Sequence, residues 1–215
     1  MKNNVKKLTA TAMFCAIAFV AVTIGRIPII LFLSYDPKDI IITLGGLIWG
    51  PATAFLISLV VSLIEMITIS DTGVIGLIMN VISTCSFACT ASFIYKRKRT
   101  LSGAIVGLLT GCITMTSVML LWNYLITPLY MNATRDQIVG MLLPVFLPFN
   151  LLKAGLNAGF AFLLYRPVIT ALRKSGLIEQ SKTNTPKKTS WGIILVASLM
   201  IVTCILFVLS LKGII

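Results

Sequence analysis

Long apolar runs, each closed by a short polar or proline-containing stretch, cover most of the chain. A helix that crosses a bilayer needs about 20 mostly apolar residues, because it rises about 1.5 Å per residue. Six runs divide the first part of the chain, and the second of them is short: 8–25, 39–49, 52–69, 74–95, 101–127 and 142–172. The pattern predicts an all-α integral membrane protein whose core is a six-helix transmembrane bundle.

A seventh apolar run stands apart from these six. Residues 175–190 are polar, and residues 191–215 start with an apolar stretch that has no ionisable or amide side chain before Lys212. We therefore expect residues 1–174 to form the functional membrane domain and residues 175–190 to form a linker. Residues 191–215 would then be an appended C-terminal transmembrane segment.

Composition and charge indicate lipid as the surrounding solvent. Hydrophobic residues make up 58% of the chain and charged residues only 11%, whereas a soluble domain carries about a quarter charged residues. The net charge of +12 comes from basic residues that flank the apolar runs. This placement is typical of topology signals and of contact with lipid headgroups. The expected partner is the lipid bilayer, and no nucleic acid is expected.

Lysine and arginine are unequally divided between the alternating loops. With the N-terminus in the cytoplasm, thirteen of the eighteen basic residues fall on the cytoplasmic side, including the run at 96–99. Cytoplasmic loops carry such an excess. The distribution predicts a multi-pass cell-membrane protein with a cytoplasmic N-terminus.

The chain lacks the residues that several classes of reaction require. The chain has no histidine, and its five cysteines lie in apolar runs without C-x-x-C spacing, so no metal or cofactor is expected. No G-x-x-x-x-G-K-[ST] motif occurs, so energy for transport would come from a separate ATPase. The expected protein is a transporter subunit and not an enzyme. An intramembrane enzyme with Glu65 as its acid or base is an alternative, and so is a stand-alone carrier.

Polar side chains inside the apolar runs are predicted to lie in the outer half of the membrane. Placing such groups in lipid costs free energy, so they are candidates for function. Asn150, Lys153 and Asn157 follow an i, i+3, i+7 spacing, which places them on one helical face. Five further residues are placed in the same outer half: Glu65, Asn80, Trp122, Asn123 and Tyr124. Together they predict a pocket open to the outside, suited to a mostly neutral, planar molecule with many hydrogen-bonding groups.

A structural role is the alternative for these polar residues. Glu65 and Lys153 would then neutralise one another, and the asparagines would only join neighbouring helices.

The first apolar run carries a pair of small residues. Ala12 and Ala16 are one helical turn apart, and small residues at this spacing let another backbone approach closely. The pair fits either a partner protein or a neighbouring span of the same chain.

Three stretches of the sequence resemble a known family. They are Tyr35-Asp36-Pro37-Lys38-Asp39, which leads to Gly45-Gly46-Leu47-Ile48-Trp49-Gly50-Pro51; Trp122-Asn123-Tyr124 with Pro128 and Tyr130; and Pro148-Phe149-Asn150-Leu151-Leu152-Lys153, which ends at Asn157. The first stretch, with the small residues of the first helix, is similar to the substrate-binding S components of energy-coupling factor (ECF) vitamin transporters. The other two resemble the riboflavin-specific members of that family.

The resemblance implies a six-helix bundle that binds riboflavin, or an FMN-like flavin, from outside. It also implies partner chains, namely a transmembrane T component and two ATPase subunits, with an S component that topples in the membrane to release its vitamin. Carried over by position, Ala12 and Ala16 would face the T component, and Tyr35 and Asp36 would help to gate the pocket. Asn150, Lys153 and Asn157 would line it. An S component for another vitamin or small nutrient is the alternative within the family.

Overall fold

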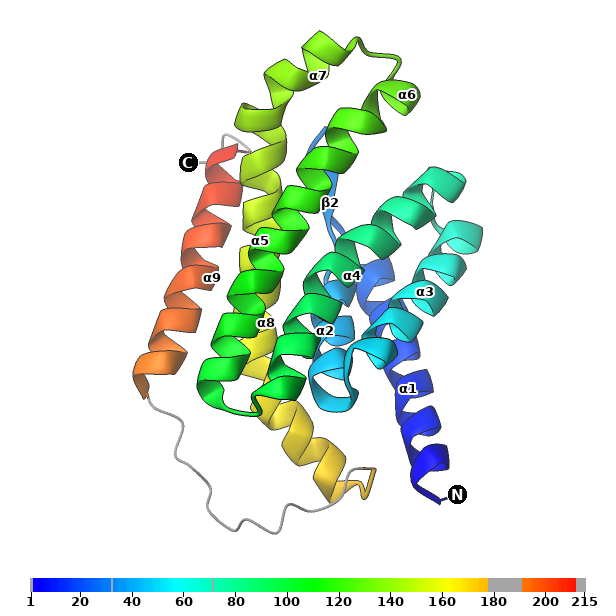
Figure 1. Ribbon diagram of the computed structural model, residues 1–215, viewed down its shortest axis with the longest axis vertical. Helices are drawn as coiled ribbons and strands as arrows, with labels where there is room; N and C mark the ends of the chain where they lie inside the picture. The colour runs from blue at the N-terminus through cyan, green and yellow to red at the C-terminus, as the bar shows by residue number, and fades with distance from the viewer. Residues whose placement is uncertain (1, 32, 71, 178–190, 212–215) are drawn as a thin grey trace.

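The computed structural model describes residues 2–31, 33–70, 72–177 and 191–211 as a bundle of helices (Figure 1). The helices of the bundle are α1 (Lys2–Gly25), α2 (Lys38–Trp49), α3 (Pro51–Thr68), α4 (Gly73–Arg97), α5 (Leu101–Leu125), α8 (Leu147–Lys174) and α9 (Trp191–Leu211). Five stretches in the described residues are long and apolar enough to cross a membrane: Asn4–Gly25, Pro51–Thr68, Gly73–Arg97, Leu101–Leu125 and Arg135–Lys174. The prediction of an all-helical membrane protein is confirmed.

Regular structure also fills two of the connections between the predicted helices. An antiparallel hairpin of β1 (Ile27–Ile30) and β2 (Leu33–Tyr35) follows α1. Two short helices, α6 (Thr127–Met131) and α7 (Arg135–Met141), and a π-helical turn, η1 (Leu142–Phe146), lead into α8. These segments lie at the end of the bundle opposite the N-terminus (Figure 1).

The short helix α2 lies in the middle of the bundle. It contacts α1, α3, α4 and α8, and most of its residues are buried. Twelve residues rise only about 18 Å, too little to cross the membrane alone. Because α2 begins with Lys38 and Asp39, it brings two charged side chains into the bundle interior, where each has less than 2% of its surface exposed.

Small residues bring α4 and α5 together. A Cβ atom at Gly107 would lie 2.7 Å from the backbone oxygen of Ala91, and one at Gly111 would lie 2.9 Å from that of Phe87. Only glycine permits this approach, which lets the two backbones pack closely within the membrane.

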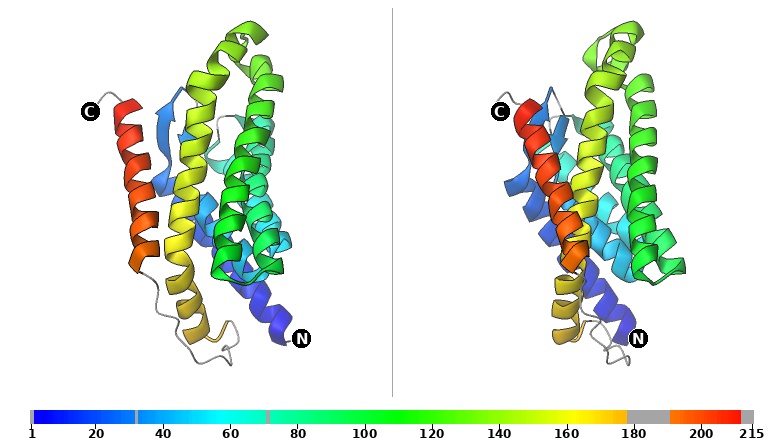
Figure 2. Two further views of the ribbon diagram at one scale, coloured as in Figure 1. Left: turned by 60° about the vertical axis from the view of Figure 1, so that its left-hand side comes forward. Right: turned by 90° about the vertical axis from the view of Figure 1, so that its left-hand side faces the viewer.

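The seventh apolar run forms α9, which packs along α8 (Figure 2). Ala197 and Ile201 of α9 are buried, and a Cβ atom at Gly155 of α8 would lie 3.2 Å from the Sγ of Cys204. Leu195 and Leu199 are exposed on α9. Most of the predicted linker, residues 178–190, lies outside the described residues, as do residues 212–215 of the predicted C-terminal segment.

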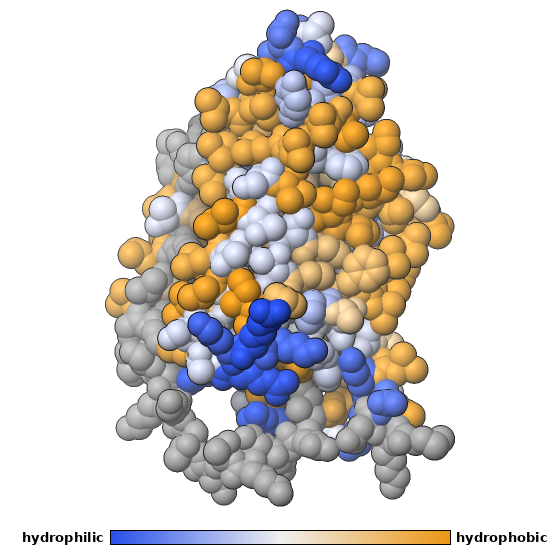
Figure 3. All heavy atoms as spheres, viewed as in Figure 1, coloured by the Kyte–Doolittle hydropathy of each residue, from blue (hydrophilic) through white to orange (hydrophobic). Residues whose placement is uncertain are grey.

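The surface matches the membrane assignment. In Figure 3 an apolar band crosses the visible face, with hydrophilic residues gathered above and below it. Large apolar side chains such as Ile113, Leu121 and Leu151 are exposed although they lie within helices. Such a surface is stable against lipid chains and not against water.

Candidate functional site

A cavity of about 590 Å³ lies at the end of the bundle that carries the β-hairpin. Its walls come from the β-hairpin and the residues around it, the α3–α4 connection, α4, α5, α6 and α8. The polar lining residues are Arg26, Ser34, Asp36, Ser70, Thr72, Asn80, Ser83, Tyr130, Asn150 and Lys153. Apolar side chains, among them Met79, Met119 and Phe149, complete the walls. A cavity that combines apolar walls with convergent polar groups is typical of small-molecule sites.

Lys153 carries the central positive charge of this site. It lies on the second turn of α8, and its Nζ is 3.3 Å from Asp36 and 3.2 Å from Asp39. An ammonium group has three N–H donors, and two carboxylates engage two of them. The third is available to a ligand in the cavity that Lys153 lines.

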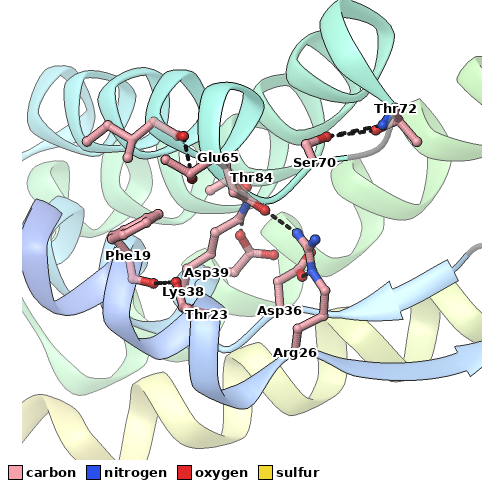
Figure 4. A network of polar contacts seen from close by, with 12 residues as sticks. Phe19, Thr23, Arg26, Asp36, Lys38, Asp39, Glu65, Ser70, Thr72 and Thr84 are labelled. Atoms are coloured by element: carbon pink, nitrogen blue, oxygen red, sulfur yellow. Dashed lines mark hydrogen bonds and ion pairs between the residues drawn. The ribbon is translucent and has the colours of Figure 1, made fainter.

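A second ion-pair group adjoins the first. Glu65 near the end of α3 accepts hydrogen bonds from Arg26 and from Lys38 (Figure 4). Arg26 also donates to Asp36 over 2.9 Å, and this bond joins the two groups. Three cations and three carboxylates thus form one neutral network, which we call the charge network: Arg26, Asp36, Lys38, Asp39, Glu65 and Lys153.

Electrostatics hold the loop members of the charge network ionised. Burial alone would raise the pKa of Asp36, but the positive charges of Lys153, Lys38 and Arg26 more than offset it and lower that pKa. Burial likewise opposes the charge of Arg26, and Asp36 with Glu65 nevertheless raises its pKa. Asp36 and Arg26 therefore contact one another as full charges at the hairpin end of the bundle.

Neutral side chains make further polar contacts at the site, two of them to Asp39. Thr84 donates to Asp39 over 2.7 Å (Figure 4), and the Asn157 amide lies 3.5 Å from the other carboxylate oxygen of Asp39. Asn150 donates to the backbone oxygen of Phe146 over 2.8 Å. Its amide group has a second N–H and an oxygen, both of which a ligand in the cavity can use.

The structure separates the predicted site residues into two sets. Asp36, Asn80, Asn150 and Lys153 line the cavity together. The others do not line it: Tyr35, Glu65, Trp122, Asn123, Tyr124 and Asn157.

Each of the second set has a different environment. Glu65 pairs with Arg26 and Lys38, so the alternative in which it neutralises Lys153 does not describe this structure. Asn123 is buried and accepts a hydrogen bond from Thr127, whereas Tyr124 is exposed. Tyr35 is buried and Trp122 partly buried, and the Tyr35 Oη, the Trp122 Nε1 and the Asn123 Nδ2 have no hydrogen-bond partner among the described residues.

Sequence reasoning did not place Arg26, Lys38 and Asp39 in the site. A signal for them was present, because a helix too short to span the membrane that begins with two charges needs partners for both. The described residues contain no group of three or more histidine, cysteine, aspartate or glutamate side chains placed to hold a metal ion. The arrangement can bind and orient a polar organic molecule.

A known protein family matches most of this chain. The family described as "ECF transporter, substrate-specific component" matches residues 6–165. The chain belongs to this family. It is therefore a transporter substrate-binding subunit and not an enzyme, and it acts with the partner chains of an ECF transporter.

Individual relatives agree with this assignment. The chain is 30% identical to the riboflavin transporter RibU of Staphylococcus aureus, over 81% of this chain and 95% of that protein. It is 29% identical to the riboflavin transporter FmnP of Bacillus subtilis, over 70% of this chain and 85% of that one. A solved structure titled "Structure and mechanism of the S component of a bacterial ECF transporter" superposes with a TM-score of 0.67 at 30% identity. The match covers 79% of this chain and 99% of the chain in that structure.

The small-residue pair of α1 lies on the surface of this S component. Ala12 and Ala16 are exposed, as are Met13 and Ile17 beside them. No other described span of the chain covers the two alanines, so packing within the chain does not account for them.

Proposed function

We propose that this S component binds riboflavin from outside the cell. Its cargo would enter the cytoplasm with energy from a T component and two ATPase subunits on separate chains. The relatives named above transport riboflavin, and the cavity offers the chemistry that a flavin needs. This orientation agrees with the positive charge near the N-terminus and at 96–99, the end away from the cavity.

The observation that carries the proposal is the arrangement of Lys153 and Asn150 on one wall of the cavity. Both come from consecutive turns of α8 and face the same space. The polar edge of a flavin ring alternates carbonyl oxygens with an N–H group. The remaining N–H of Lys153 would donate to a carbonyl, and the Asn150 amide would both donate and accept.

Other residues that line the cavity suit the ring faces and the ribityl chain of riboflavin. Met79, Met119 and Phe149 offer apolar surface for the ring faces. Ser34, Ser70, Thr72 and Ser83 bring hydroxyl groups for the ribityl chain. An FMN-like flavin would place its phosphate near Arg26, the most exposed cation of the charge network.

Flavin fluorescence tests the proposal. Riboflavin titrated into the purified protein in detergent should lose fluorescence on binding, with saturation at one flavin per chain. Asn150→Leu should weaken this binding at least tenfold, because it removes a donor and an acceptor from the cavity wall. Leu151→Ala is the matched control on the same helix turn, since Leu151 is exposed and does not line the cavity.

The alternative ligand is tested in the same assay. Absence of riboflavin quenching, with saturable binding of another member of a vitamin panel, would replace the ligand and keep the family. Uptake of riboflavin into cells that lack every ECF ATPase would show a stand-alone carrier and overturn the proposed energy source.

A further inference from the structure

The β-hairpin is the part of the cavity wall that depends most on its neighbours. In the described residues β1 and β2 form a sheet of two strands, with Ile27 opposite Tyr35 at its base. A two-stranded hairpin is marginally stable alone and needs further strands or a helix to pack against. The position of this hairpin therefore depends on the elements that contact it.

Ion pairs hold the base of the hairpin. Arg26 precedes β1 and Asp36 follows β2, and their side chains pair over 2.9 Å. Lys153 of α8 contacts Asp36 over 3.3 Å. These contacts lie at the base, whereas Leu31 between the strands is 58% exposed. The charge network therefore does not by itself fix the tilt of the two strands.

The helix α9 supplies a packing surface for the hairpin. Among the helices of the described residues, it makes the most extensive contact with β1. Both views in Figure 2 place the C-terminal half of α9 beside the hairpin. The phenol of Tyr35 at the end of β2 also lies within electrostatic range of the Cys204 thiol of α9. The contact with α9 thus involves both strands.

One face of α9 packs against α8 and sets its position. Ala197, Ile201 and Cys204 recur at i, i+4 and i+7 on this face, where the first two are buried and Cys204 is partly buried. Gly155 of α8 makes room for the face, because a Cβ atom there would lie 3.2 Å from the Cys204 Sγ. The same turn of α9 therefore contacts α8 and lies near Tyr35.

Movement of the hairpin would change access to the cavity. Leu33 and Ser34 of β2 line the cavity, and so do Arg26 and Asp36 at the base. Tyr35 is 5% exposed and does not line it, and its Oη has no hydrogen-bond partner among the described residues. Packing, and not a hydrogen bond, therefore holds this side chain in place.

We propose that α9 acts as a clamp on the β-hairpin and thereby slows ligand exchange. It restrains the hairpin in the free protein and in the ligand-bound protein alike. Because an equal restraint on two states leaves the difference between them unchanged, association and dissociation both become slower while the affinity stays nearly the same. The effect on ligand exchange rests on the proposed function, whereas the restraint on the hairpin does not.

Hydrogen–deuterium exchange of the ligand-free, full-length protein tests the clamp. Gly155→Leu places bulk against Cys204, and Ala197→Phe places bulk at a buried position of α9 two turns earlier. Each variant should increase amide exchange of residues 27–35 at least fivefold, because exchange there requires opening of the strand pairing that α9 supports. Reaction of Cys204 with a membrane-permeant maleimide establishes that α9 has moved.

Matched variants separate the clamp from the general effect of added bulk. Gly140→Leu makes the same substitution on α7, where a Cβ atom would meet nothing within 4 Å. Leu199→Phe adds bulk to the exposed face of α9. Both controls should keep the wild-type amide exchange of residues 27–35.

Stopped-flow flavin fluorescence measures the consequence for the cavity. Gly155→Leu and Ala197→Phe should release riboflavin at least threefold faster than the wild type. Their dissociation constants should stay within a few-fold of the wild-type value, since association also becomes faster.

The possible outcomes distinguish the clamp from the proposed ligand. Unchanged exchange of residues 27–35 in a variant whose Cys204 reacts with the maleimide would overturn the clamp, and so would an equal increase in the controls. Faster hairpin exchange with unchanged riboflavin rates would overturn its role in ligand exchange. Faster hairpin exchange in a protein whose wild type does not bind riboflavin would support the clamp and refute the proposed ligand.

Discussion

The Nζ atom of Lys153 lies 3.2 Å from a carboxylate oxygen of Asp39, and this contact joins the beginning of α8 to the first turn of α2. Both side chains are buried. Because Asp36 also contacts Lys153 and is bonded to Arg26, the wall of the cavity and the base of the hairpin share one set of charges. The ligand contact proposed for Lys153 would therefore be coupled to the position of the hairpin.

Replacing Lys153 tests this coupling. Lys153→Met leaves Asp36 and Asp39 without their shared cation, and breaking a buried ion pair from one side costs about 3–5 kcal/mol of stability. We expect a lower unfolding temperature and loss of riboflavin binding, measured by thermal unfolding in detergent and by flavin fluorescence. Lys153→Arg keeps the charge and should retain more of the stability. Wild-type unfolding and affinity in Lys153→Met would contradict the assigned ion pairs.

The Lys38–Glu65 pair is tested by a double-mutant cycle. Lys38→Met leaves Glu65 with only Arg26, and Glu65→Leu leaves the fully buried Lys38 without a carboxylate. Each single variant should be strongly destabilised, whereas the double variant removes both charges and restores neutrality. We expect the double variant to be more stable than the sum of the single effects, by about 0.5–3 kcal/mol in denaturant unfolding. Additive effects would show that the two residues do not interact.

The helices were predictable from the sequence, and the partners in the charge network were not. Runs of apolar residues report how long a segment stays in lipid, so four of the described spans agree with the predicted runs within a few residues. The fifth, Arg135–Lys174, begins seven residues before the predicted run 142–172. Such runs give the depth of a polar residue but not the direction in which it faces. Glu65 and Lys153 were both predicted to lie in the outer half of the membrane, yet Glu65 pairs with Lys38, 27 residues away, and Lys153 with Asp36, 117 residues away.

The β-hairpin could not be predicted from the sequence for a related reason. The segment from 27 to 35 is short and contains Pro28, and its two strands are stabilised by pairing with each other and by burial of Leu33 and Tyr35. Short strands have no helical periodicity, and proline lowers their apparent strand preference. The one-sided placement of Asn150 and Lys153 could be predicted because both lie on a single helix, where spacing alone sets the face.

Acid should weaken the hairpin end of the site through Asp36. The pKa of this carboxyl in the folded protein is below its usual 3.8, so its ion pairs contribute full stability above that value. The contribution is lost as the pH falls from 3.8 through the lower folded-state pKa. Unfolding temperature measured from neutral pH down to about pH 3 should decline at the acid end. Asp36→Asn should be less stable at neutral pH and should decline less with acid, and a parallel decline in both proteins would assign the effect to other groups.

Enlarging the small residues of α1 should affect assembly and not ligand binding. Ala12→Leu/Ala16→Leu adds bulk to an exposed face that is remote from the cavity, and close approach of a second backbone depends on small residues. We expect reduced co-purification with the T component and ATPases, with riboflavin affinity in detergent within twofold of the wild type. Ala171→Leu, at an exposed position of α8, is the control. Normal assembly of the α1 variant would exclude this face as the interface.

Removal of α9 should leave the ligand site intact. The charge network joins residues from 26 to 153, and α9 packs mainly against α8, with a smaller contact to β1. A chain ending at Leu177 should therefore bind riboflavin within a few-fold of the full-length protein. Gly155→Leu in the full chain should displace α9, because a Cβ atom there already lies 3.2 Å from the Cys204 Sγ, and it should expose Cys204 to a membrane-permeant maleimide. If the shortened chain is monodisperse but fails to bind, α9 is needed to hold β1 over the cavity, and the functional domain extends beyond residue 174.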